Sequence, residues 1–140
     1  MSVSRGDARE HPNALAYRRT ADAFRARDFA ALQALFDPDV VWHMPGHNIR
    51  AGEIRGLDAV VALLTGLPAG YTIGEHDVLG NDEHVVALSN MGVRRPGLEL
   101  MTRVANVFHF REGRQVERWF YPEDMETWDQ ALNLPGEAAG

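Results

Sequence analysis

The chain has 140 residues, 45% of them apolar and 24% charged, which is the balance of an ordinary globular protein with a packed core. It contains no cysteine, which excludes disulfides, thiolate nucleophiles and cysteine-bound zinc. The formal net charge of −6 argues against a broad basic face that would bind nucleic acid.

This length is near the usual size of one domain, so we expect a single domain over residues 1–140. Its ordered core should span residues 12–134, because the first ten residues and the tail LPGEAAG have the composition of flexible ends. The start, MSVSRGDAREHP, lacks the apolar stretch of a signal peptide, and no apolar run approaches the ~18 residues of a membrane span. We therefore expect no membrane association and a cytoplasmic location.

Apolar side chains at three- and four-residue spacings predict helices in the first half of the chain. The first helix presents a stripe that includes Leu15, Ala16 and Phe24, with arginines on its other face. Asp28 is placed to cap the second helix, and Pro38 disfavours helical backbone at the residue before it. The predicted elements are helices over residues 12–27, 29–36 and 57–67, a strand over 40–44 and an irregular loop over 45–56.

From residue 71 onward the period of the apolar residues changes to two, which predicts an antiparallel meander of strands. The expected strands are residues 71–81, 83–93, 98–110 and 114–121, separated by ND, RRPG and REG turns, and a last helix covers 123–134. Gly74, Gly80 and Gly92 are candidates for the bulges that curve a sheet. The predicted fold is α+β: a cone-shaped, curved antiparallel sheet whose concave face is covered by the three earlier helices, enclosing a pocket, with a short C-terminal helix.

A resemblance to known proteins rests on three segments, DFAALQALFDPDVVWHMPG, GEIRGLDAVVALL and FHFREGRQVERWFYPED. They are similar to the SnoaL-like polyketide cyclase and ketosteroid isomerase branch of the nuclear transport factor two superfamily, and the similarity covers residues 12–134. The resemblance implies an interior pocket for a small-molecule substrate, a homodimer formed through the outer sheet face, and chemistry without a cofactor. This scaffold serves isomerases, cyclases, epoxide hydrolases, dehydratases and binding proteins, so it does not fix the reaction.

The chain departs from two known reactions of this superfamily at the positions that perform them. The tyrosine, the carboxylate base and the second acid of the steroid isomerases correspond to Thr20, Met44 and Asn106, so the base is missing. The two acids of the limonene-type epoxide hydrolases correspond to Gly92 and Tyr121, so both carboxylates are missing. Neither reaction is expected to run unchanged.

Alternation along the strands groups a different set of polar side chains with apolar neighbours, which is the composition of a small-molecule pocket. The predicted catalytic residues are His43, Asn106, Tyr17 and Tyr121. The predicted substrate-binding residues are Val41, Trp42, Met44, Thr20, Asn90, Leu88, Phe108 and Trp119. The outer face, with the dimer contact, is expected to carry Val85, Ala87, Ser89, Met91, Met101 and Val107.

His43 is the first candidate for moving a proton, because an imidazole titrates near neutral pH. Asn106 would donate a hydrogen bond to an oxygen on which charge develops, helped by a tyrosine. Each residue also has a plainer interpretation. The histidine could simply bond a backbone carbonyl, the asparagine could join neighbouring strands as a buried amide, and the tyrosines could place hydroxyls at the pocket rim.

No HExxH, GxGxxG or GxxxxGK[ST] motif occurs, so neither a metal site nor a nucleotide cofactor is predicted. The expected function is a cofactor-independent enzyme that isomerises, cyclises or dehydrates a mostly apolar oxygenated metabolite, such as a polyketide, by acid–base chemistry. The alternative is a non-catalytic small-molecule-binding or accessory domain of the same fold, because the carboxylates of the better-known relatives are replaced.

Overall fold

The computed structural model describes residues 7–136, which form an α+β fold as the sequence predicts. The predicted flexible ends lie partly outside this range, at residues 1–6 and 137–140. Within it, Ala8–Glu10 form a short 3₁₀ helix, η1, capped by the Asp7 side chain. Over the described range, no helix is both long enough and apolar enough to cross a membrane.

Three of the five helices that follow begin at a residue whose side chain caps them, at His11, Asp28 and Asp124. The five are α1 (Pro12–Arg25), η2 (Phe29–Ala31), α2 (Leu32–Leu35), α3 (Leu57–Thr65) and α4 (Met125–Leu132). Pro12 opens α1 at a position that needs no backbone N–H, and the His11 side chain accepts a hydrogen bond from the amide of Asn13. The Asp28 side chain caps η2 by accepting from the amide of Ala31 at 3.3 Å. The predicted second helix is therefore present, but shorter and partly 3₁₀.

Six strands form one curved sheet. They are β1 (Phe36–Met44), β2 (Gly52–Arg55), β3 (Tyr71–Gly80), β4 (His84–Arg95), β5 (Leu98–Arg111) and β6 (Arg114–Pro122), in the spatial order β2-β1-β6-β5-β4-β3. β3 to β6 form the predicted antiparallel meander, whereas β1 joins β6 in parallel. The sheet is thus antiparallel except at this one junction, which brings the first strand of the chain beside the last.

The strand β2 lies where the sequence predicts only an irregular loop. It pairs antiparallel with β1 and places Ile54 opposite Trp42. Its four residues, GEIR, contain one large apolar side chain, so alternation could not reveal it. β1 also begins at Phe36, earlier than predicted, and passes through Pro38, where its pairing with β6 shifts register.

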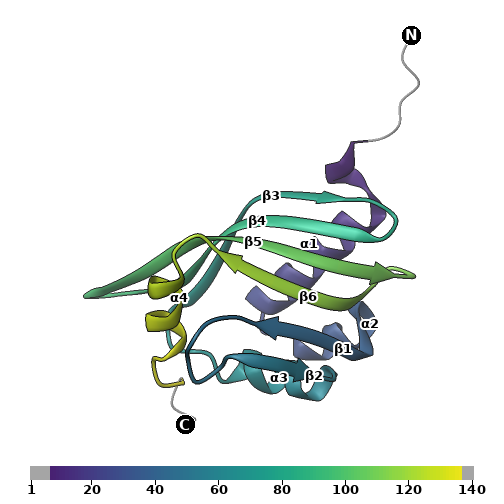
Figure 1. Ribbon diagram of the computed structural model, residues 1–140. Helices are drawn as coiled ribbons and strands as arrows, with labels where there is room; N and C mark the ends of the chain where they lie inside the picture. The colour runs from purple at the N-terminus through teal and green to yellow at the C-terminus, as the bar shows by residue number, and fades with distance from the viewer. Residues whose placement is uncertain (1–6, 137–140) are drawn as a thin grey trace.

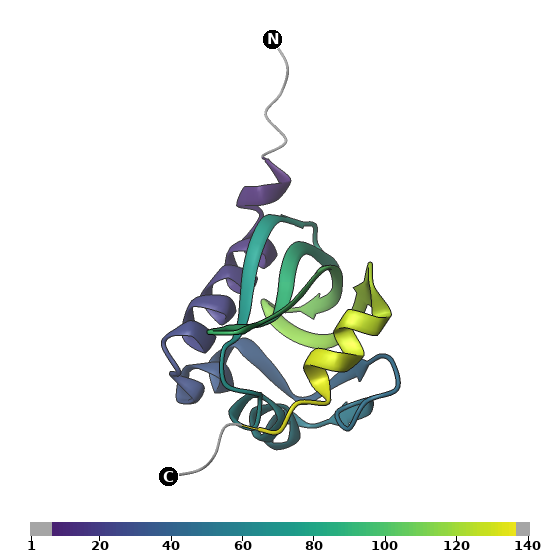
Figure 2. The ribbon, with the colours of Figure 1, turned by 90° about the vertical axis from the view of Figure 1, so that its left-hand side faces the viewer.

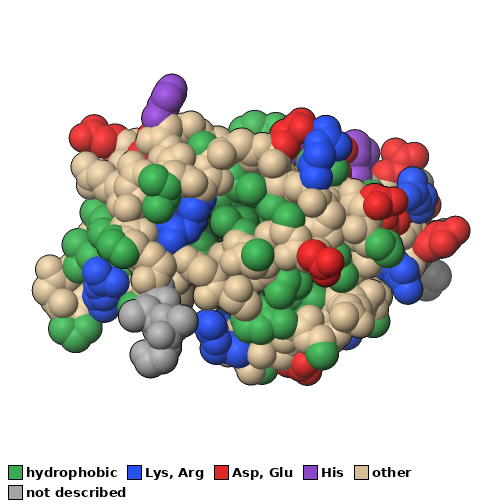
Figure 3. Space-filling view, turned by 90° about the horizontal axis from the view of Figure 1, so that it is seen from below, with side chains coloured by type: hydrophobic (Ala, Val, Ile, Leu, Met, Phe, Trp, Pro, Cys, Tyr) green, Lys and Arg blue, Asp and Glu red, His purple; other side chains and the backbone are tan. Residues whose placement is uncertain are grey.

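The sheet curls around an interior that the helices close. Figure 1 shows β3 to β6 arching above β1, β2 and α3, and the turned view of Figure 2 shows α1 along one side of the curl and α4 across its end. α1 contacts β3, β4 and β6, while α2 and α3 contact β1. Seen from below, hydrophobic side chains gather near the hollowed middle of the surface, and charged ones lie mostly towards its edges (Figure 3). The predicted cone with helices over its concave face is confirmed.

Burial alternates along much of β1, β4, β5 and β6 and separates an inner face from an outer face. On β1, Val40, Trp42 and Met44 are buried, whereas Val41 and His43 between them are half-buried. The main core lies under α3 and α4; its largest fully buried members are Trp128, Phe36, Leu32, Met91 and Leu132. A second cluster lies under α1 and contains Tyr17, Val78, Val85, Ala87, Phe108 and Phe110.

Candidate active site inside the cone

Two small cavities lie between the helices and the inner face of the sheet. Their volumes are about 30 Å³ and about 20 Å³, which gives each room for one or two water molecules. The side chains that border both are Trp42, Leu64, Ile73 and Arg118. We call these two cavities with their lining residues the interior site.

Arg118 brings a positive charge into this apolar interior. It projects from β6 with 4% of its surface exposed, and the rings of Phe120, Trp42 and Phe108 lie 4.1, 4.6 and 4.8 Å from its guanidinium carbon. Among residues 7–136, no carboxylate oxygen lies within 4.0 Å of its nitrogens. Burial lowers the pKa of Arg118 because desolvation disfavours the charged form, but a guanidinium remains protonated in proteins.

A single side chain holds the Arg118 guanidinium in place. Arg118 Nη2 donates to Asn106 Oδ1 at 2.7 Å, while Asn106 Nδ2 donates to the carbonyl of Ala87 at 3.1 Å on the neighbouring strand. Asn106 is fully buried and lines neither cavity. Its amide therefore positions Arg118. It also joins neighbouring strands, as the plainer interpretation of Asn106 predicts, so its part in the site is indirect.

Glu75, on β3, is the carboxylate that lines the interior site. Its side chain is 8% exposed and accepts hydrogen bonds from the Tyr17 hydroxyl, at 3.2 Å, and from Arg25 Nη2. A register shift between Glu75 and Asp77 leaves Glu75 on the inner face and turns the following part of β3. α1 and β3 together thus build a triad of Tyr17, Glu75 and Arg25 at the wall of the first cavity.

Burial raises the pKa of Tyr17 to about 12, and the Glu75 carboxylate adds to this effect while the charge of Arg118 opposes it. Because the folded protein then holds this proton more tightly than the unfolded chain does, the neutral hydroxyl contributes fully to stability below about pH 10. That contribution is lost as the pH rises from about 10 to about 12. We expect Tyr17→Phe to remove one tyrosinate absorbance step near pH 12 and to flatten the pH dependence of the free energy of unfolding across this window. An unchanged absorbance titration would contradict this assignment.

Two further hydroxyl groups lie on the inner face. Tyr71, at the start of β3, lines the second cavity, and burial raises its pKa above the usual range. Thr20 lines the first cavity, but its hydroxyl donates to the carbonyl of Ala16 at 3.1 Å within α1. The hydroxyl of Tyr71 is therefore better placed than that of Thr20 to meet a ligand.

The interior site includes part of the set that the sequence predicts. Tyr17, Thr20 and Trp42 line the first cavity, and Met44 lines the second together with Trp42. Phe108 and Asn106 lie on the inner face behind the lining residues and are 0% exposed.

The prediction that the other candidates face the interior is wrong. Those on the outer face are Val41, His43, Leu88, Asn90, Trp119 and Tyr121. Residues grouped within one strand do share a face as predicted. The predicted set, however, joins inward-facing residues of β5 with outward-facing residues of β1, β4 and β6. For the same reason, four residues predicted for the outer face are instead buried inside: Val85, Ala87, Ser89 and Met91. The other two, Met101 and Val107, do face outward.

His43 belongs to a polar cluster on the outer face. Its Nε2 lies 2.6 Å from Glu117 Oε2, its Nδ1 lies 3.7 Å from Glu53 Oε1, and its ring stacks on Trp119 at a centroid distance of 5.1 Å. His109 continues the cluster, with Nδ1 3.8 Å from Glu117 Oε1. No group of three or more such side chains within residues 7–136 has the arrangement of a metal site. The catalytic role of His43 stays a prediction, and if it holds, the chemistry takes place outside the cone.

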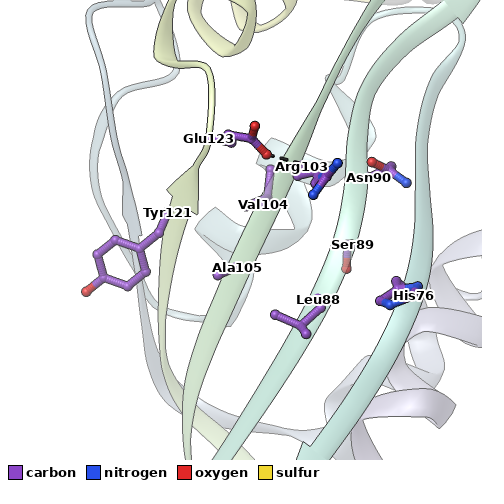
Figure 4. A pocket seen from close by; sticks show the side chains of 9 residues that line it. All are labelled: His76, Leu88, Ser89, Asn90, Arg103, Val104, Ala105, Tyr121 and Glu123. Carbon is purple, nitrogen blue, oxygen red and sulfur yellow. Dashed lines mark ion pairs between the residues drawn. The ribbon is translucent and has the colours of Figure 1, made fainter.

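An open groove on the outer face has a volume of about 620 Å³. Figure 4 shows that its side chains come from β3, β4, β5 and β6 and, for Glu123, from the segment after β6, with Tyr121 pointing away from the groove and an ion pair between Arg103 and Glu123. The groove is wide, and its titratable side chains are exposed to solvent rather than enclosed. We therefore place the candidate chemistry in the smaller interior site, where burial makes a charge effective.

Sequence reasoning missed Arg118, Glu75, Arg25 and Tyr71 in this site. Arg118 lies two residues before Phe120, so it should share the face of that aromatic residue and could point inward. Glu117 lies two residues before Trp119, however, and the same argument applies to that pair. The two phases of β6 are thus equivalent in the sequence, and only the pairing of the strands decides between them.

Comparison with known proteins gives a family and a fold. A family model described as a SnoaL-like domain matches residues 17–118. An uncharacterized protein of Mycobacterium tuberculosis is 38% identical over 102 residues, which cover 69% of this chain and 78% of that protein. The family that the sequence predicts is confirmed.

Solved structures agree with this fold. Bal32a, from a soil-derived mobile gene cassette, superposes with a TM-score of 0.79 at 28% identity, covering 86% of this chain and 96% of that one. An LEH-like epoxide hydrolase of M. tuberculosis superposes with a TM-score of 0.67 at 20% identity, covering 86% of this chain and 89% of that one. The second likeness, at such low identity, concerns the fold alone.

Proposed function

The chain belongs to the SnoaL-like family, and from this premise we propose that it is a cofactor-independent acid–base enzyme. It would isomerise, cyclise or dehydrate a mostly apolar oxygenated metabolite, such as a polyketide, within the interior site, whose two cavities of about 30 and about 20 Å³ must widen to admit such a molecule. The observation that carries the proposal is the buried guanidinium of Arg118, which has no carboxylate partner among residues 7–136 and borders both cavities, one of which is also lined by Glu75.

The proposed reaction begins when Glu75 accepts a proton from a carbon next to a carbonyl group of the substrate. The electron pair of the broken C–H bond forms a double bond to the carbonyl carbon, and the carbonyl oxygen takes the negative charge. Arg118 faces this oxygen in an apolar surrounding, where a fixed positive charge is far more effective than in water. In a substrate with a carbon–carbon double bond next to the deprotonated carbon, the charge spreads along the conjugated system, and return of the proton from Glu75 to its far carbon shifts the double bond and completes an isomerisation.

Tyr17 and Arg25 would position the base. The hydroxyl of Tyr17 and the guanidinium of Arg25 each bond one oxygen of Glu75, which fixes the carboxylate against the wall of the first cavity. A base that is already oriented does not lose conformational freedom at the moment of reaction.

Substitution of Glu75 tests this proposal. Polyketide-like, steroid and terpene-epoxide compounds would be screened by thermal shift, and every hit analysed for product. We expect Glu75→Gln to bind a converted compound but to turn it over at least about 100-fold more slowly, because it lacks the base. Glu99→Gln, an exposed substitution at the β4–β5 turn, should convert at the rate of the unmodified protein.

A third variant separates the interior site from the outer face. Loss of conversion in His43→Ala, with conversion retained in Glu75→Gln, would overturn the proposed site and place the chemistry at the cluster of His43, Glu117 and Trp119. Far-ultraviolet circular dichroism of both variants shows whether a lost rate reflects lost folding.

A non-catalytic small-molecule-binding domain is the second candidate function. The observation that favours it is that both oxygens of Glu75 already accept hydrogen bonds, from Tyr17 and from Arg25, so the carboxylate could serve only to join α1 to β3. Binding of a compound without conversion, equal in the unmodified protein and in Glu75→Gln, would support this alternative.

We also propose that the outer sheet face forms a homodimer. Its half-buried apolar side chains are Val41, Val86, Leu88, Val107 and Trp119, next to Tyr121, which is 57% exposed. Light scattering should give twice the chain mass of 15.6 kDa. Tyr121→Glu should weaken the association about tenfold or more, because an aromatic anchor would be replaced by a charge. A monomeric mass at all concentrations would refute the dimer.

A further inference from the structure

The first cavity of the interior site is surrounded by more positive than negative charge. Arg118 and Arg25 each supply a guanidinium, whereas Glu75 supplies the only carboxylate in its lining. Arg25 is hydrogen-bonded to Glu75, so these two charges offset one another. The charge of Arg118 is left without a counter-ion.

Most of the hydrogen-bonding capacity of Arg118 is also unused. Its one hydrogen bond within the described chain is to Asn106, and its Nε is buried without any partner. An unpaired buried charge destabilises the fold even after the protein relaxes, and stacking on three aromatic rings offsets only part of this cost. An apolar side chain at this position of β6 would carry no such cost, which indicates that the charge serves a bound molecule.

The surroundings of Arg118 restrict the chemistry of that molecule. Trp42, Leu64 and Ile73 border both cavities with it, so the bulk of a ligand would meet apolar surface. A neutral carbonyl group would give Arg118 a hydrogen bond but leave its charge uncompensated. A planar oxygen anion gives both, because its two oxygens match the donors of the guanidinium fork.

We propose that the interior site widens from its two small cavities to bind its substrate as an oxygen anion, either a carboxylate or an ionised enol, paired with Arg118 and attached to an apolar ring that lies against Trp42. This inference rests on the proposed function, since it concerns the same cavities, and it narrows the metabolite to an acid that is ionised at neutral pH. The anion enters as the neutralising partner of Arg118, and Glu75 remains available for the proton.

Matched pairs of probes test the charge preference by isothermal titration calorimetry. The carboxylate 2-naphthoate is compared with 2-naphthamide, and the acidic enol 2-hydroxy-1,4-naphthoquinone with its methyl ether, so each pair differs mainly in charge. We expect at least one anion to bind the unmodified protein about tenfold or more tightly than its neutral counterpart, and the better pair tells carboxylate from enol. Arg118→Met should bind both members of that pair equally, and Arg118→Lys should keep the preference for the anion.

Several results would overturn this inference: equal binding of anion and neutral compound in both pairs, no binding by any of the four compounds, or an anion preference that survives in Arg118→Met. If Arg118→Met does not fold, the comparison in the unmodified protein and in Arg118→Lys still decides. Glu75→Gln separates this inference from the proposed function, because it should keep the anion preference while losing turnover. An anion preference without any conversion would support this inference and count against the enzyme.

Discussion

Gly92→Ala is expected to lower the free energy of unfolding by about 3 kcal/mol or more. Gly92 lies in β4 with φ at +147°, a backbone conformation that residues with a Cβ rarely adopt. A Cβ at this position would lie 1.9 Å from the carbonyl oxygen of Leu100 in the paired strand β5. That oxygen belongs to the backbone and cannot rotate away, so the two longest strands of the sheet would have to separate.

Gly74→Ala provides the matched control for this measurement. Gly74 lies on the adjacent strand β3, opposite Asn90, and a Cβ there would meet no atom within 4 Å. We expect this substitution to change the free energy of unfolding by no more than about 1 kcal/mol, in the stabilising direction, because alanine restricts the unfolded chain. Urea denaturation of both variants gives the comparison, and equal losses would show that the backbone of Gly92 is not under this constraint.

The period of the apolar residues was enough to predict most of the fold. The changes from helical spacing to alternation, with glycine and proline at the turns, located α1, α3, α4 and the meander from β3 to β6. These features follow from local chemistry, which the sequence contains directly. Gly92 has a positive φ, but β4 pairs with β5 without a register shift there, and the irregularity between β3 and β4 lies instead between Glu75 and Asp77, so the prediction of a bulge at Gly92 is not met.

The faces of the strands could not be predicted, because they depend on register. Alternation shows that Val41 goes with His43 and that Asn106 goes with Phe108, but it does not show which of the two groups faces inward. A shift of one residue exchanges the faces, and the parallel pairing of β1 with β6, which places His43 beside Trp119 on the outer face, has no local signal. The residues of the interior site can therefore be identified only from the three-dimensional pairing of strands that are distant in the sequence.

Asn106→Leu is expected to lower the free energy of unfolding by about 3 kcal/mol, although leucine has the same branched shape as asparagine. The substitution removes the only acceptor that the described part of the chain offers the buried Arg118 guanidinium, since Nη2 donates to Asn106 Oδ1 at 2.7 Å. The cost thus comes mainly from a stranded charge rather than from lost packing.

The double variant Arg118→Met with Asn106→Leu should recover most of that loss, because it removes the charge together with its acceptor and fills the space with apolar side chains. The free energy of unfolding of Arg118→Met alone should lie between those of Asn106→Leu and the double variant. This single substitution leaves Asn106 Oδ1 unpaired, at a cost of about 1–3 kcal/mol. Urea denaturation of all four proteins completes the cycle. If the two substitutions were instead additive, the guanidinium would be satisfied by other groups, and the case for Arg118 as an unpaired charge awaiting a ligand would fail with it.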